Sequence, residues 1–168
     1  FLTDRHSIKD EKSFERYLGR LKEFSRVISE VKVRVMDDRD NGVMPPDFII
    51  EKALLGMRKF YEGGAIANPL ITTLSSKLET IDEMSDQRKA ELTQQAVTLV
   101  DQSVLPKYQE MIALFEEMLT LTDHDAGIWR IPQGEKIYQV ALRSNNSTTL
   151  SAEKIHQIGL DEVARKEI

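Results

Sequence analysis

Three histidines, His6, His124 and His156, are the residues of this sequence best suited to bind a metal ion. A zinc peptidase site of the His-Glu-x-x-His type needs two histidines one helical turn apart, so that both imidazoles reach the same ion. None of the three is followed by glutamate or by a second histidine four residues later. The sequence therefore predicts no metal ligand and no catalytic residue in this chain.

Other catalytic motifs are missing as well. The chain has no cysteine, which excludes a disulfide framework, a thiolate zinc site and a cysteine nucleophile. It contains no Gly-x-Ser-x-Gly elbow, phosphate loop or dinucleotide fingerprint. Asp37, Asp38 and Asp40 resemble half of a calcium loop, but Ile49 occupies the twelfth position, where such a loop needs glutamate. These aspartates are better interpreted as a solvated helix end.

Three polar side chains are weak candidates for substrate binding. His156 falls within the apolar arc of the last predicted helix, so it is either a half-buried structural histidine or a group that reaches a cavity. Tyr138 and Arg143 lie near an irregular loop and could present a hydroxyl and a guanidinium to a peptide carboxylate or another anion. The structural interpretation is preferred for each: a histidine that holds a neighbouring helix or turn, a core tyrosine and an exposed helix-end arginine.

The charge pattern limits the classes of partner. The chain has 23 basic and 28 acidic side chains, a net charge of -5, and both signs are interspersed along it. A nucleic-acid groove needs a basic patch, so no nucleic-acid partner is expected. No apolar run approaches the roughly 20 residues that cross a bilayer, so no transmembrane segment is expected in this chain.

Helical periodicity dominates the pattern of apolar residues. Between Asp10 and Asp38 they recur every three or four positions, which predicts an amphipathic helix about 42 Å long. The fold class predicted is all-α, an elongated bundle of long amphipathic helices, with residues 1–168 as one helical portion of a larger domain. The last helix has no glycine, asparagine or proline stop signal, so the chain is expected to continue. Later helices are predicted to begin near Pro46, Asn68, Ser85, Glu135 and Ser151.

Two segments leave alternatives open. The apolar pattern keeps its phase through Pro106, so one helix kinked between Gln102 and Leu105 is preferred to two helices. Residues 128–131, within a stretch rich in helix breakers, could form a short strand. Trp129, the only tryptophan, is expected to plug the bundle rather than to stack on a substrate.

Several segments together resemble one bacterial family. The most specific is Ile155-His156-Gln157-Ile158-Gly159, which lies within a longer similar stretch from residue 148 to 163. Residues 133–138, 142–143 and, more weakly, 42–46, 68–70 and 104–108 are also similar, in the same order. On these segments the chain resembles the family named domain of unknown function 885 over nearly its whole length. The family tends to open the last helix with Thr-Pro-Glu-Glu, whereas this chain has Ser151-Ala152-Glu153-Lys154, which weakens the expected cap.

The resemblance implies an all-helical protein of several hundred residues, often with a secretion or lipoprotein signal, grouped with zinc-dependent metallopeptidases. The family's zinc motif, of the His-Glu-Ala-x-Pro-Gly-His type, lies downstream of the matching region, so none of its residues can be assigned here. The chain would then be the N-terminal helical part of a zinc-dependent peptidase or hydrolase and form the wall of a substrate cleft. Zinc would belong only to the full-length protein.

The partners implied by the resemblance are a peptide substrate and the remainder of the same polypeptide. A periplasmic or cell-envelope location is favoured over the cytoplasm, because members of the family are often located there. The alternative, which the residues alone support equally, is a non-catalytic helical binding or scaffold module of the cell envelope.

Overall fold

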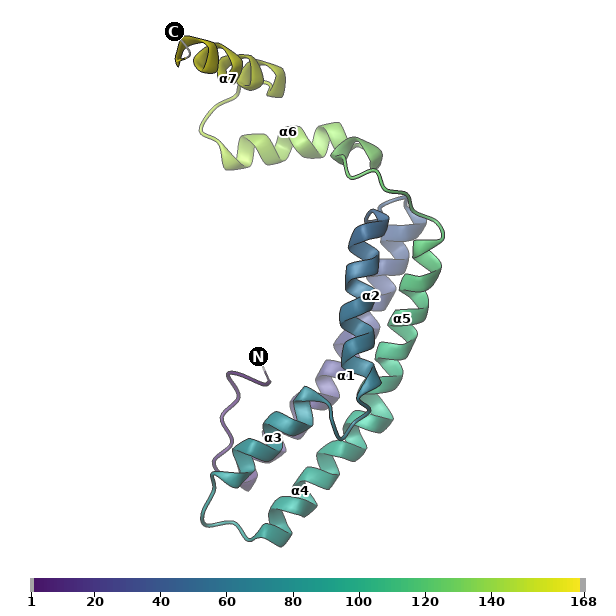
Figure 1. Cartoon of the computed structure of the whole chain (residues 1–168), viewed down its shortest axis with the longest axis vertical. Helices are drawn as coiled ribbons and strands as arrows, with labels where there is room; N and C mark the ends of the chain where they lie inside the picture. Colours follow the sequence, from purple (N-terminus) through teal and green to yellow (C-terminus); the bar gives the residue numbers. More distant parts are fainter. Residues whose placement is uncertain (1, 167–168) are drawn as a thin grey trace.

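The computed structural model describes residues 2–166, and all regular secondary structure in that range is helical (Figure 1). The predicted all-α class is confirmed. The elements, in order, are α1 (Glu11–Asp40), α2 (Asp47–Glu62), α3 (Pro69–Glu79), α4 (Asp86–Leu99), a π-helical turn η1 (Val100–Val104), α5 (Leu105–Leu119), a 3-10 turn η2 (Ile128–Arg130), α6 (Gly134–Asn145) and α7 (Ala152–Lys166).

Helices α1 to α5 form an elongated bundle, residues 11–119. With 30 residues, α1 is about 45 Å long and contacts both α4 and α5. Helix α2 packs on α5 at one end, and α3 packs on α4 at the other. Residues 128–166, here called the arm, leave the end of the bundle where α1, α2 and α5 meet (Figure 1).

Side-chain caps fix the helix starts at positions that the sequence indicates. Asn68 accepts a hydrogen bond from the backbone N–H of Leu70 at 3.0 Å, and Ser85 accepts one from Arg88 at 3.3 Å. Helix α2 starts directly after Pro46. The helices therefore begin where short polar side chains or proline satisfy or remove free N–H groups.

Helices α4 and α5 are continuous through η1, which agrees with one long helix rather than two. In a regular helix the ring of Pro106 would press on the carbonyl of Gln102. The π-helical turn relieves this clash. Its hydrogen bond spans five residues instead of four, from the N–H of Leu105 to the carbonyl of Val100. The hydroxyl of Ser25 on α1 donates to the carbonyl of Ser103 at 2.9 Å. The distortion around the proline is thus also used to bind α1.

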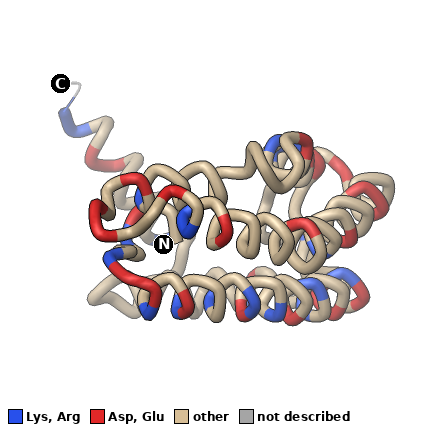
Figure 2. Tube along the Cα trace, turned by 90° about the horizontal axis from the view of Figure 1, so that it is seen from below, with Lys and Arg blue, Asp and Glu red and all other residues tan. Residues whose placement is uncertain are grey.

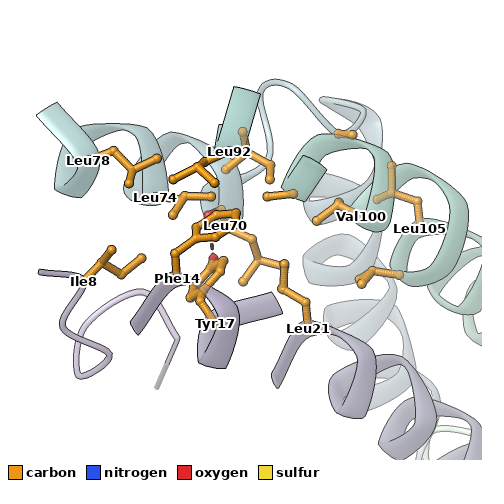
Figure 3. Packing of buried hydrophobic residues seen from close by; sticks show 14 residues of the cluster. Ile8, Phe14, Tyr17, Leu21, Leu70, Leu74, Leu78, Leu92, Val100 and Leu105 are labelled. Atoms are coloured by element: carbon orange, nitrogen blue, oxygen red, sulfur yellow. Dashed lines mark hydrogen bonds between the residues drawn. The ribbon is translucent and has the colours of Figure 1, made fainter. Parts of the chain in front are cut away.

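The larger apolar cluster joins α1, α3, α4 and η1 (Figure 3). Phe14 and Tyr17 are each 1% exposed and lie between α1 and α3. The Tyr17 hydroxyl donates to the carbonyl of Leu70 at 2.7 Å, and burial raises the pKa of Tyr17 to about 12. The other members are Ile8, Leu21, Ala65, Leu70, Ile71, Leu74, Leu78, Leu92, Ala96, Val100, Val104 and Leu105.

A second apolar cluster joins α2 to α5 nearer the arm. It contains Ile50 and Leu54 of α2, and Ile28 of α1 packs against both clusters. The long helix α1 therefore connects the two parts of the core. The members from α5 are Met111, Leu114 and Met118.

Acidic and basic residues are interspersed along the helices (Figure 2). Lys32 of α1 pairs with Glu110 of α5 at 3.0 Å, and Arg58 of α2 pairs with Glu116 at 2.6 Å. Such exposed pairs contribute at most about 1 kcal/mol each, so the apolar clusters carry most of the stability. In the part of the chain that the structure describes, no helix is long and apolar enough to span a bilayer.

Candidate functional site

The first of the three histidines, His6, is a structural residue. It is buried, and its Nε2 atom lies 3.1 Å from the carbonyl oxygen of Ser13. Its Nδ1 atom contacts the guanidinium of Arg20, and its ring meets the edge of Tyr17. Because both nitrogens are in hydrogen-bond contact, His6 holds the segment before α1 and has no nitrogen left for a ligand.

The other two histidines lie elsewhere. His124 follows α5, and its Nδ1 atom lies 2.8 Å from a carboxylate oxygen of Asp47 at the start of α2. His156 is on α7 in the arm. Across residues 2–166, no three histidine, aspartate or glutamate side chains come together in a way that could hold a metal ion. The residues described do not fit a zinc site.

The loop that leads into the arm forms turns instead of the predicted short strand. The carboxylate of Asp123 accepts from the N–H of Asp125 at 3.1 Å, and that of Asp125 accepts from Gly127 at 3.3 Å. The following residues, Ile128–Arg130, form η2. The strand prediction is wrong because these local side-chain bonds turn the chain, and in the described residues no strand is present to pair with it.

Arg130 fastens the arm to the bundle. Its side chain is 15% exposed, and one guanidinium nitrogen donates to the carbonyl of Met44 at 2.7 Å. The other donates to the hydroxyl of Thr122 at 3.0 Å and to the carboxylate of Asp123 at 3.2 Å. The Thr122 hydroxyl in turn donates to the carbonyl of Pro45 at 2.7 Å. The planar guanidinium thus joins the loop before α2 to the loop after α5.

We expect Arg130→Ala to loosen this junction by about 1–3 kcal/mol, the cost of losing charged hydrogen bonds to partly buried acceptors. Hydrogen exchange should accelerate in residues 120–133, while exchange in α4 stays unchanged. Arg130→Lys keeps the charge but not the planar fork, so it should restore only part of the protection. Arg165→Ala is the control. It removes one partner of an exposed ion pair within α7 and should leave exchange in residues 120–133 unchanged. Equal exchange in Arg130→Ala and the natural protein would contradict this role.

The turn from η2 into α6 is closed by two unusual backbone positions. Gln133 has a left-handed φ of 58°. A Cβ atom on Gly134 would lie 1.8 Å from the carbonyl oxygen of Ile128, which no side chain can tolerate. Gly134 is therefore required for the close approach of α6 to η2, and it fixes the direction in which the arm starts.

Trp129 lies on the surface rather than inside the bundle. Its side chain is 75% exposed, and its indole N–H donates to the carboxylate of Asp125 at 3.2 Å. The expectation that it plugs the bundle is wrong. The reason is that η2 lies outside both apolar clusters, where the loop geometry turns this residue away from the core.

The three substrate-binding candidates all lie in the arm and are all exposed. Tyr138 is 45% exposed, so it is not a core tyrosine, and Arg143 is an exposed residue near the end of α6, as expected. His156 is exposed too, so the predicted half-burial is not found. None of the three side chains has a hydrogen bond to another described residue. Tyr138 and Arg143 are five positions apart, about 140° around the helix, so they cannot contact one small ligand together.

The start of α7 is capped despite its departure from the family pattern. The hydroxyl of Ser151 accepts from the backbone N–H of Lys154 at 3.3 Å. The backbone N–H of Glu153 itself and, next, the Ser151 hydroxyl hold the pKa of Glu153 below its usual range. A carboxylate in the first turn also interacts favourably with the helix dipole. The cap thus forms without an acid at the third position.

Comparisons with known proteins connect this geometry to one family. The family described as "Bacterial protein of unknown function (DUF885)" matches residues 1–167. A crystal structure described as that of the putative lipoprotein from Colwellia psychrerythraea is similar, with 30% identity and a TM-score of 0.87. The match covers 98% of this chain and 28% of that chain, so this chain spans little more than a quarter of its neighbour's length. No curated protein gives a significant match.

Proposed function

Because the chain belongs to the DUF885 family, we propose that it is the N-terminal helical part of a larger, envelope-associated protein and forms the wall of a substrate cleft. The similar structure of a chain described as a lipoprotein supports the envelope location. The match covers only 28% of that lipoprotein chain, which supports the proposal that this chain is part of a larger protein. On this proposal the bundle is a rigid base and the arm is the part that faces the ligand.

The observation that carries the proposal is the arm itself. It stands off the end of the bundle, joined to it by Arg130, and exposes the side chains of Tyr138, Arg143 and His156, which have no hydrogen-bond partners in residues 2–166. A guanidinium is the side chain best suited to a carboxylate, because its N–H groups match the two oxygens. The ligand class proposed is therefore a peptide, bound in part through its carboxylate.

We propose that any hydrolysis is carried out by polypeptide outside this chain. A zinc ion there would act as a Lewis acid and activate water for peptide cleavage. The described residues do not fit a zinc site, so they contribute shape and access rather than a step of the reaction.

The test uses the purified full-length gene product. We expect stoichiometric zinc and chelator-sensitive cleavage of small peptides. Arg143→Ala should raise KM by about tenfold, roughly the 1.4 kcal/mol of a charged hydrogen bond, for peptides with a free C-terminal carboxylate but not for amidated peptides. Lys154→Ala, which removes an exposed positive charge from α7, is the matched control. A metal-free protein that cleaves no member of a broad peptide library would overturn the peptidase proposal.

The second candidate is a non-catalytic binding or scaffold module of the cell envelope. The exposed apolar residues of the arm favour it, since they suit an interaction surface without any chemistry. Under this alternative the same peptides bind with an affinity that depends on Arg143, and no product forms. Calorimetric binding without cleavage would therefore select the second candidate.

A further inference from the structure

Both arm helices expose an apolar side that no described residue covers. Val140 is 62% exposed and Val163 is 58% exposed, although both are aliphatic. Neither apolar cluster of the bundle includes a residue of the arm. The joint apolar face, as we name it, consists of Ile137 and Val140 on α6 with Leu160 and Val163 on α7.

These helices need packing that the described residues do not supply. The hydrogen bonds of α6 and α7 side chains join near neighbours, such as Gln157 to Asp161 at 2.8 Å. The helices have 12 and 15 residues, lengths at which an isolated helix is only marginally stable in water. Burial of an apolar side is the usual source of the missing stability. The joint apolar face therefore marks where another surface packs.

The comparison with the lipoprotein structure favours one occupant for this face. The match extends over 98% of this chain at a TM-score of 0.87, so the similar structure repeats the arrangement of bundle and arm. In the similar structure, this arrangement is part of a longer chain, because the match covers only 28% of that chain. We propose that the joint apolar face is the docking surface for helices of the same polypeptide outside residues 1–168. This inference rests on the larger protein named in the proposed function, but not on its peptidase activity.

The docking surface separates the candidate residues into two groups. Arg143 lies at the border of this face on α6, between Lys136 and Gln139 on the helix surface, about 60° from Val140 and about 120° from Ile137. Its long side chain extends from the border into solvent when the apolar side is covered. His156, in contrast, lies on the apolar side of α7, so docking covers it. Arg143 is thus the charged candidate of the arm left to face a ligand.

The experiment is hydrogen exchange on the full-length gene product with two pairs of matched variants. Val163→Asp and Ile137→Asp introduce a charge into the joint apolar face, and we expect exchange in α7 to accelerate at least ~10-fold in both. Lys154→Asp and Gln139→Asp introduce an acidic side chain on the exposed polar side of the same helices and should not accelerate exchange. Exchange in α5 reports whether each variant keeps its bundle folded.

Three results would overturn the inference. One is equal exchange in Val163→Asp and Lys154→Asp with a folded bundle. Another is protection of α7 that disappears when an oligomer is diluted to monomer, which would assign the face to a second copy. The last is a gene product without polypeptide beyond this chain. A protein that cleaves no peptide would leave these measurements unaffected, so the two proposals fail separately.

Discussion

Gly134→Ala is expected to disorder the start of the arm while the bundle stays folded. The added Cβ would lie 1.8 Å from the carbonyl oxygen and 2.7 Å from the carbonyl carbon of Ile128. Both are backbone atoms, so a side-chain rotation cannot relieve the clash, and η2 must move away from α6. Overpacking of this kind costs about 1–3 kcal/mol or more. Because no residue of α6 belongs to either apolar cluster, packing on the bundle does not offset that cost.

Trp129 provides the measurement for this variant, since it is the only tryptophan and lies within η2. We expect its fluorescence spectrum to change and hydrogen exchange in residues 128–145 to approach that of an unfolded segment. Gly159→Ala is the matched control, because a Cβ there meets no atom within 4 Å. It should stabilise α7 by about 0.5–1 kcal/mol, as alanine does inside a helix. An unchanged spectrum and unchanged exchange in Gly134→Ala would refute the tight turn.

The bundle was largely predictable from sequence because its determinants are local. The capping residues Asn68 and Ser85 act on N–H groups two or three positions away. Pro106 distorts its own helix, and the apolar period around it keeps that helix continuous. These signals are contained in a window of a few residues, which is the range that periodicity and capping arguments cover.

The candidate site was less predictable because its determinants are distant or lie outside the chain. Arg130 binds the carbonyl of Met44, 86 positions earlier, and nothing in the residues next to it indicates that contact. The apolar arc of α7 predicted burial of His156, but burial depends on which surface faces the helix. Among the described residues no surface packs on that side of α7, so His156 is exposed, and the apolar pattern alone does not say which surface covers it.

The largest loss of stability is expected for Phe14→Ala. Phe14 is 1% exposed and lies among side chains from α1, α3 and α4, so its removal leaves a cavity that several rigid helices border (Figure 3). Replacement of a buried phenylalanine by alanine costs about 3–5 kcal/mol. Domains of this kind have a total stability of about 5–15 kcal/mol, so this variant should be close to unfolding at room temperature.

Urea unfolding followed by circular dichroism measures this loss as a lower midpoint with an unchanged slope. Val33→Ala on the same helix is the control, since Val33 is 66% exposed and its truncation should change stability by less than about 0.5 kcal/mol. Ile28 packs against both apolar clusters, and α4 continues into α5 through η1. The cavity at Phe14 should therefore also accelerate exchange around Met118, at the far end of the bundle. Loss of protection confined to the larger cluster would mean that the two clusters unfold independently, despite the two long helices that they share.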